Sequence, residues 1–307
     1  MQSKYIIRNY QSEDKPAAIQ LYKNLIEHHS DIIYWQPGPE SNWKNVYCVF
    51  YKDLMIAKGQ LEAINIVSTD HSANASHLLF FNIKLHSNWE DDNELRNLLY
   101  KKVLEGAKLL KKKLPAQFPV KFCVGNFASE AKENAYLESR GFDHFKSLYW
   151  MRCKLNNLIP QSALKIPDIS VKHWDMGTRV EELAYLQAEQ GIWPDEPTNL
   201  EKLPAYKSNP FWKAITAFYN GEIIGSIMAW KEKQEDIGTI ENVFVKPHWR
   251  KYGLASYLIS EGLHYLKSCN LSKVQLLVET ENESALKLYR SLGFETIKEE
   301  KRYWIDL

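Results

Sequence analysis

The stretch "VFVKPHWRKYGLASYLI", residues 243–259, brings together residue types suited to binding an anion. A short apolar run leads to a proline, three cations lie around it, and a regular helical pattern starts after Gly253. The first amides of a helix have no intrahelical partners and carry a partial positive charge, and a glycine there lets an anion approach the backbone. The spacing R-x-x-G-x-A, set by Arg250, Gly253 and Ala255, therefore predicts a phosphate cradle.

This cradle differs from two other phosphate-binding motifs. No GK[ST] follows the glycine, as it would in a Walker A loop, and the glycines of a dinucleotide-binding GxGxxG are missing. One pyrophosphate held by backbone amides is the interpretation that fits the residues.

A second stretch makes a family resemblance specific. The first stretch resembles the acetyl-CoA pyrophosphate loop of the GCN5-related N-acetyltransferase (GNAT) superfamily, whose pattern is [QR]-x-x-G-x-[GA] after an apolar strand. The second signature of that family, N-x-x-A-x-x-x-Y-x-x-x-G-F, is matched by "NESALKLYRSLGF", residues 282–294. Both signatures occur in order, and the resemblance covers residues 168–307.

The resemblance implies how acetyl-CoA would bind. Backbone amides of residues 251–256 would hold the pyrophosphate, and the strand before them would pair with the pantetheine arm like an added strand. A strand amide near Phe244 would polarise the thioester carbonyl. The cofactor-binding residues implied in this way are Val243, Phe244, Val245, Arg250, Lys251, Tyr252, Gly253, Leu254, Ala255, Ser256 and Asn282.

The resemblance also implies catalytic roles. Tyr289 would protonate the leaving CoA thiolate, which is reasonable chemistry for a phenol whose pKa is about 10. The amine attacks directly, so no cysteine nucleophile is needed. Glu241, which shares a strand face with Val243, is the favoured base, with Glu279 and His248 as alternatives. Tyr289 could instead be a core aromatic residue, and Glu241 a surface charge.

A long proline-rich segment, residues 192–212, corresponds to the loop that borders the acceptor site in this family. Its aromatic residues could contact substrate or could simply pack in the core; the substrate candidates are Trp193, Tyr206 and Trp212. Two acids of the segment could attract a cationic amine or could be solvated, namely Asp195 and Glu196.

The elements that must position these residues follow the order β-α-loop-β-β-β-α-β-α-β over residues 168–307. Apolar periodicity predicts a strand over 238–245, and helices over 254–269 and 283–293. A hairpin turns at Asn220-Gly221, and Gly293 fits the position just past a helix end.

The same unit occurs twice in the chain. "NAYLESRGFDHFKSLYWMRCKL" (134–155) aligns with "LKLYRSLGFETIKEEKRYWIDL" (286–307), and other segments repeat in the same order. We therefore predict an α/β fold of two tandem GNAT-like units, each a mixed, mostly antiparallel sheet flanked by helices. The predicted domains are a degenerate unit over 1–155, a linker over 156–167 and a catalytic unit over 168–307.

The first copy departs from the pattern at the cradle. Its acids would repel a pyrophosphate, since like charges about 4 Å apart repel by about 1 kcal/mol even in bulk water; they are Glu90, Asp91, Asp92 and Glu94. Leu137 stands opposite Tyr289, and Glu130 opposite Asn282. We expect this copy to pack against the active one and to shape the acceptor pocket.

Composition excludes several classes of function. The 307 residues carry a net charge of +1, which gives no basic footprint for nucleic acid. Four dispersed cysteines without a CxxC pair argue against a zinc knuckle or a disulfide scaffold and suit a reducing compartment. There is no signal-peptide pattern and no run of roughly 18 apolar residues. We therefore expect a cytoplasmic protein without a metal, membrane or nucleic-acid partner; the oligomeric state stays open.

The sequence therefore predicts an N-acetyltransferase with its site in the C-terminal half. It would move an acetyl group from acetyl-CoA to a primary amine of a small molecule or peptide, by direct attack in a ternary complex. A non-catalytic acyl-CoA sensor or scaffold is one alternative. An aminoacyl transferase of the peptidoglycan-bridge type is another, although such enzymes usually lack the pyrophosphate loop. Tandem members of the superfamily include mycothiol-synthase-like enzymes, but no residue here identifies a thiol-sugar acceptor.

Overall fold

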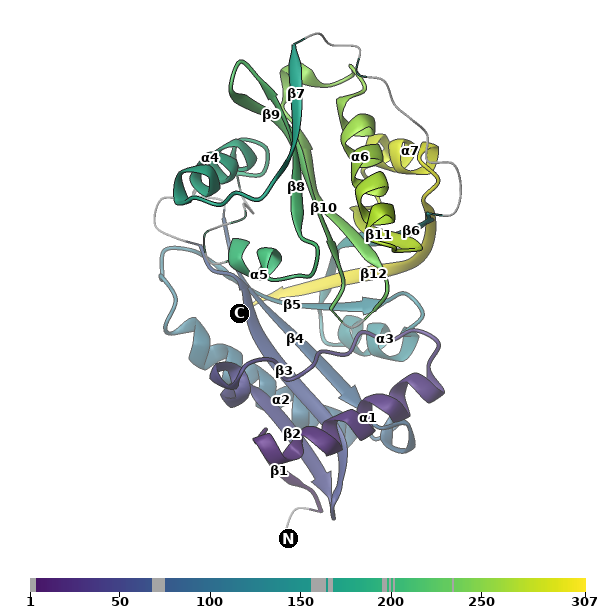
Figure 1. The fold of residues 1–307 in the computed structure, drawn as a ribbon. Coiled ribbons are helices and arrows are strands. Elements are labelled where there is room, and N and C mark those ends of the chain that lie inside the picture. Colours follow the sequence, from purple (N-terminus) through teal and green to yellow (C-terminus); the bar gives the residue numbers. More distant parts are fainter. Residues whose placement is uncertain are drawn as a thin grey trace. The chain divides into compact units, whose positions relative to one another are not determined.

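The computed structural model describes residues 4–67, 75–155, 164, 168–194, 198, 200, 202–233 and 235–307 (Figure 1). The chain forms two compact units. Unit 1 comprises Met1–Ser147 together with Glu300–Leu307, and unit 2 comprises Leu148–Glu299. Of the predicted linker, only Leu164 lies among the described residues.

Unit 1 is a sheet with a helix against each face. Its sheet order is β1-β2-β3-β4-β5-β12, antiparallel except for the parallel pair β4–β5. One core includes side chains of α2 and α3, and another includes side chains of α1. Its elements are β1 (Ile6–Asn9), η1 (Ser12–Asp14), α1 (Lys15–His28), η2 (Glu40–Asn45), β2 (Val46–Tyr51), β3 (Leu54–Asn65), β4 (His77–Leu85), η3 (Ser87–Trp89), α2 (Asn93–Lys111), β5 (Val120–Phe127) and α3 (Ala131–Ser139).

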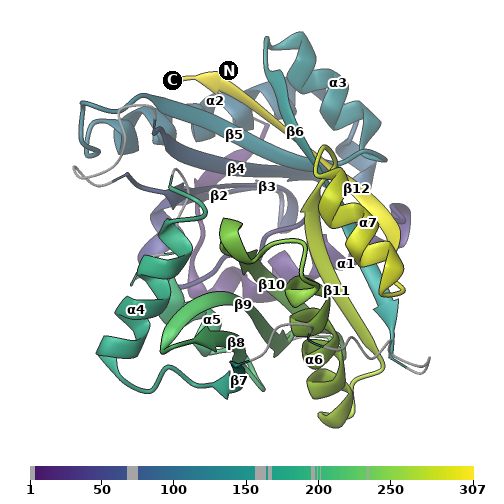
Figure 2. The same ribbon diagram turned by 90° about the horizontal axis from the view of Figure 1, so that it is seen from above.

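Unit 2 repeats this plan, and its element order is the predicted one. Figure 2 shows α6 on one side of strands β8–β10 and α4 on the other. The buried apolar side chains form one core that includes α6 and another that includes α4. The predicted fold class, tandem α/β units with mostly antiparallel sheets, is confirmed. The elements are β7 (Ile169–Trp174), α4 (Arg179–Gln190), α5 (Leu203–Lys207), β8 (Lys213–Tyr219), β9 (Glu222–Lys231), β10 (Gly238–Val245), η4 (Pro247–Trp249), α6 (Leu254–Ser268), β11 (Lys273–Glu279) and α7 (Glu283–Ser291).

The two copies exchange their closing strands. Residues 148–154 of β6 (Asp143–Lys154) pair antiparallel with β11, so the strand that ends the first copy completes the sheet of unit 2. Residues 300–306 of β12 (Glu295–Asp306) likewise pair with β5 in unit 1. The repeat pattern placed each closing strand with its own copy. Because the two strands have similar sequences, the repeat pattern alone does not assign each strand to a sheet.

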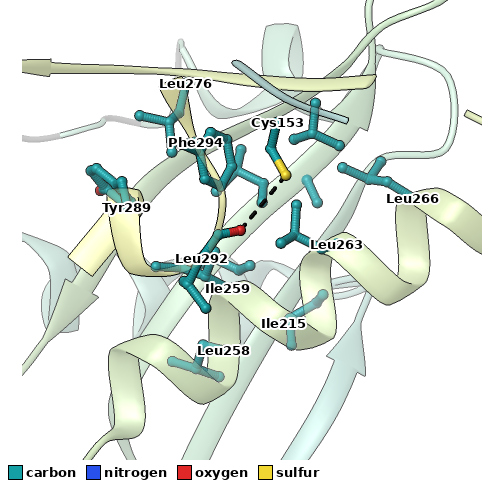
Figure 3. Close-up of a cluster of buried hydrophobic side chains, with 14 of the residues drawn as sticks. Cys153, Ile215, Leu258, Ile259, Leu263, Leu266, Leu276, Tyr289, Leu292 and Phe294 are labelled. Atoms are coloured by element: carbon teal, nitrogen blue, oxygen red, sulfur yellow. Dashed lines mark hydrogen bonds between the residues drawn. The ribbon is translucent and has the colours of Figure 1, made fainter. Parts of the chain in front are cut away.

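The core on the α6 side fixes the helices that carry the predicted site. Figure 3 shows its apolar side chains, with Tyr289 of α7 at one end. Gly262 lets α6 lie close to the sheet, because a Cβ there would come within 2.6 Å of Ile227 Cδ1. Among the described helices, none has the length and apolar character needed to cross a membrane.

Candidate active site

A cleft of about 550 Å³ lies in unit 2 between the end of β10, the start of α6 and one face of α7. It gathers most of the residues predicted from the sequence, which come from three separate stretches of the chain. The predicted residues that line it are Trp193, Val243, Phe244, Val245, Arg250, Lys251, Gly253, Leu254, Ala255, Ser256, Asn282 and Tyr289.

The start of α6 has the form of an anion cradle. Gly253 is its N-cap and has φ of +83°, a conformation that only glycine adopts without steric cost. No described heavy atom lies within 4 Å of where a Cβ would stand, so the glycine is required for its backbone and not for packing. As a glycine, the N-cap residue of α6 has no side chain with which to cap the helix. The first amides of α6 can therefore serve a bound anion.

The equivalent helix of unit 1 is α2, and its N-terminus is capped by a carboxylate of the chain itself. Asp92 is the N-cap of α2, and its Oδ1 accepts a hydrogen bond from the Leu95 amide at 2.9 Å. That hydrogen bond lowers the pKa of Asp92, and Tyr5 donates a second one to Oδ2 at 2.7 Å. In unit 1 a side-chain oxygen therefore stands where a phosphate oxygen would lie in unit 2.

The three cations around the cradle differ in position. Arg250 Nε donates to the Val245 carbonyl at 3.0 Å, which ties the loop to the end of β10. Lys251 is exposed at the cleft and has φ of +70°. Lys246 instead forms an ion pair with Glu222 at 2.5 Å and lines a different groove beside α4. Arg250 and Lys251 therefore supply the positive charge at the cleft.

The strand beside the cleft has an open edge. In the described pairing, β10 meets β11 only at Gly238–Val274 and Thr239–Gln275. The equivalent strands of unit 1 pair over a longer stretch, from His77 to Phe81. Residues 240–245 therefore lack this neighbour and can take an extended ligand as an added strand.

A β-bulge lies in the middle of that open stretch. The register between β10 and β9 shifts between Glu241 and Phe244, and Asn242 has φ of +50°. A bulge re-aims the residues that follow it, here Val243 and Phe244 at the cleft. The apolar pattern of the strand does not predict this bulge. The signal available was an asparagine inside a strand, since asparagine tolerates the left-handed region better than most residues.

Tyr289 is a buried phenol at the wall of the cleft. It lines the cleft, is only 7% exposed, and its ring meets Phe294 edge to face at 6.0 Å. Burial raises the pKa of its phenol to about 12, so the group stays protonated at neutral pH.

Glu241 lies on β10, next to the bulge, and is held by Tyr206. The Tyr206 hydroxyl donates to Glu241 Oε1 at 3.3 Å, and burial is the main cause that raises the pKa of Tyr206. Glu241 is outside the lining of the cleft itself. Glu279, the alternative base, is exposed at the end of β11.

Other predicted residues have varied positions. Trp193 lines the cleft, where its ring meets Phe244 edge to face at 6.0 Å. Trp212 is 7% exposed and packs in the core on the α4 side. Tyr252 is exposed and is outside the lining of the cleft. Asp195 and Glu196 lie outside the described residues.

Several lining residues were not predicted as site residues. Of those on α7, Ala285 follows from the geometry of the helix, because a position four residues from Tyr289 shares its face. Ile192 has no chemical signal in the sequence. The additional lining residues are Ile192, Trp249, Ser284, Ala285 and Leu288.

The segment of the chain that carries the cleft is similar to a known protein family. Residues 179–294 match the sequence model of the family described as "Acetyltransferase (GNAT) family". The chain is 27% identical over 201 residues to the mycothiol acetyltransferase of Thermobifida fusca (strain YX), which covers 56% of this chain and 61% of that protein. It is 30% identical over 182 residues to the mycothiol acetyltransferase of Thermomonospora curvata, covering 56% and 58%. The chain thus spans less than two thirds of these relatives.

Solved structures share the whole fold. A GCN5-related N-acetyltransferase from Sphaerobacter thermophilus matches with a TM-score of 0.78 at 18% identity, covering 100% of this chain and 96% of that one. A tandem GNAT protein from the clavulanic acid biosynthesis pathway matches with a TM-score of 0.68 at 10% identity, covering 98% of each. At such identities the structures inform on fold alone. Residues 179–294 thus match the acetyltransferase (GNAT) family model, and the chain shares its fold with a solved GCN5-related N-acetyltransferase and a solved tandem GNAT protein.

Proposed function

We propose that the protein is an acetyl-CoA-dependent N-acetyltransferase whose active site is the cleft of unit 2. The observation that carries the proposal is the start of α6. This helix begins after a glycine N-cap and lines the same cleft as the buried phenol of Tyr289. A diphosphate on the amides of residues 251–256 would leave the pantetheine arm to run along the open edge of β10. That path leads from a cationic loop toward Tyr289, as the transfer of an acyl group from CoA requires.

The chemistry needs one bond to form and one to break. The amine nitrogen attacks the thioester carbonyl carbon, and the amide near Phe244 stabilises the oxyanion. The C–S bond then breaks, and the CoA thiolate takes its proton from Tyr289. Glu241 accepts the proton that the amine loses, directly or through a water, while Tyr206 holds its carboxylate in place.

The acceptor is a primary amine of a small molecule or a peptide. The names of the relatives give one class to test first, molecules related to mycothiol. A non-catalytic acyl-CoA sensor would need the cradle but not Tyr289. An aminoacyl transferase would not need the cradle.

The test follows CoA thiol release over a panel of amines, in the native protein and in Tyr289→Phe. Tyr257→Phe is the matched control, since this tyrosine lies on α6 outside the lining of the cleft. We expect Tyr289→Phe to lower kcat by about 10²- to 10⁴-fold, the usual contribution of a general acid, with little change in the KM for acetyl-CoA. Equal activity in both variants would contradict the role of Tyr289. Tight CoA binding without turnover on any amine would favour the sensor.

A further inference from the structure

The β-bulge of β10 is held from outside the strand by a buried carboxylate that the proposed mechanism does not use. Glu189 lies in the last turn of α4 and is 1% exposed. Its Oε2 accepts the Thr198 amide at 2.8 Å and its Oε1 accepts the Thr198 hydroxyl at 2.5 Å. A carboxylate is buried at this depth only when it is hydrogen-bonded, and Thr198 supplies both bonds.

The Thr198 hydroxyl links Glu189 to the bulge residue Asn242. Asn242 Nδ2 donates to Thr198 Oγ1 at 3.0 Å and lies 3.3 Å from Glu189 Oε1. Asn242 is the residue of β10 with a positive φ, and it stands where the register with β9 shifts. A directed chain of hydrogen bonds therefore runs from the bulge residue through a threonine to the buried carboxylate.

Two aromatic residues near Glu189 in the chain also contact β10, at Phe244, two residues after Asn242. The ring of Phe244 meets Tyr185 edge to face at 5.8 Å and Trp193 at 6.0 Å. The carbonyl of Glu189 accepts the Trp193 amide at 3.1 Å, so one residue organises both contacts with β10. The strand is therefore contacted by hydrogen bonds at Asn242 and by the rings of Tyr185 and Trp193 at Phe244.

In unit 1 the equivalent strand, β4, has no such bulge in its middle. The pairs between β3 and β4 run without a register shift from Ala57–Leu85 to Ala63–Leu79, and the shift in this pair of strands lies beyond them, between Ala63 and Asn65 of β3. Lys84, which lies one residue before the end of β4 as Phe244 lies before the end of β10, is buried and forms an ion pair with Glu130. The bulge and its hydrogen-bond chain occur in unit 2, the unit in which α6 begins after a glycine N-cap.

We propose that Glu189 and Thr198 are positioning residues: through Asn242 they set the bulge so that the strand amide near Phe244 meets the thioester carbonyl. This inference rests on the proposed function. The amide's alignment would affect the chemical step, since a displacement of about 1 Å can lower a rate by about 100-fold. The diphosphate cradle lies beyond the end of the strand, at residues 251–256, and would be unaffected.

The experiment compares two substitutions at one position. Thr198→Val keeps the shape but removes the hydroxyl, whereas Thr198→Ser keeps the hydroxyl. Thr239→Val is the matched control, because Thr239 also donates to a carboxylate, Glu232, from the other end of β10. We expect Thr198→Val to lower kcat by about 10- to 100-fold with the KM for acetyl-CoA nearly unchanged. Thr198→Ser and Thr239→Val should stay close to the native rate.

Two results would overturn the inference. One is a folded Thr198→Val protein whose kcat stays within about twofold of the native value, since misalignment should act on the rate. The other is a kcat loss that Thr239→Val shares, which would indicate a general loss of packing. If Thr198→Val does not fold, Glu189→Gln, which keeps the size of the side chain, is measured instead and should lower kcat in the same way.

A binding measurement separates this inference from the proposed function. In protein labelled with ¹⁵N-valine, the Val243 and Val245 amide resonances should shift when acetyl-CoA binds to the native protein and to Thr198→Ser, and much less in Thr198→Val. If these shifts occur but no amine is acetylated, the positioning role stands and the transferase proposal fails. If neither resonance responds to bound acetyl-CoA in the native protein, the inference is wrong.

Discussion

Replacing Gly253 by alanine tests whether the start of α6 is shaped for a diphosphate. Gly253 has φ of +83°, and an L-residue held there is destabilised by about 1–2 kcal/mol. The helix start can avoid this strain by rotating out of the left-handed conformation, which would displace the amides of residues 251–256. A loss of about 1–2 kcal/mol in the binding free energy corresponds to a CoA Kd about 5- to 30-fold weaker.

Gly221 is the matched control. It lies in the hairpin turn of the same unit with φ of +82°, and, as at Gly253, no described heavy atom lies within 4 Å of a Cβ built there. Gly221→Ala should therefore lose a similar free energy of unfolding without any change in CoA affinity. Isothermal titration calorimetry with CoA and thermal unfolding of both variants provide the data. If the two variants bind CoA with the same Kd, the helix start does not hold the diphosphate.

Four further predictions concern the charges, the acid, the first unit and the core. Arg250→Glu should raise the KM for acetyl-CoA while the thermal unfolding curve stays nearly native; an unchanged KM would contradict the cationic role. Because the pKa of Tyr289 is raised to about 12, its proton is retained as pH rises from 7 to 10, so kcat should show no decline from loss of this acid until pH approaches 12. A Tyr289-dependent decline centred near pH 9 would refute this assignment. Asp92→Ala should lower stability by about 0.5–2 kcal/mol through loss of the α2 cap. The pKa of Asp92 is lowered in the folded state, so this difference should be present at neutral pH and should vanish as acid protonates the native carboxylate. Gly262→Ala should destabilise by about 1–3 kcal/mol, since its Cβ would lie 2.6 Å from Ile227 Cδ1, and calorimetry showing native stability would contradict that packing.

The parts of the site that the sequence revealed are local in the chain. Arg250, Gly253 and Ala255 lie on one strand-to-helix junction, and the structure brings them to one cleft with Tyr289 of the second signature. In both stretches the chemistry depends on the geometry of a single helix and its first turn. Spacing along the chain is then enough to place the residues.

What the sequence did not reveal depends on contacts between distant segments. Lys246 looks like a third cradle cation in the sequence. In the structure it forms an ion pair with Glu222 of the preceding hairpin and does not line the cleft. Glu189 reads as an ordinary helical acid, and only its contacts with Thr198 and Asn242 show why it is buried. Such pairings are set by tertiary packing, which spacing does not encode.

The exchange of closing strands has the same explanation. β6 and β12 have similar sequence patterns, so the repeat does not indicate which sheet each strand joins. The assignment of residues 1–155 and 168–307 as separate domains therefore stays a prediction.

A crystal structure of the protein with acetyl-CoA tests the central claim most directly. The account predicts phosphate oxygens within hydrogen-bond distance of the backbone amides of residues 251–256, and the thioester beside Phe244 and Tyr289. A diphosphate bound at residues 89–94, or at a site on the chain away from the start of α6, would contradict it.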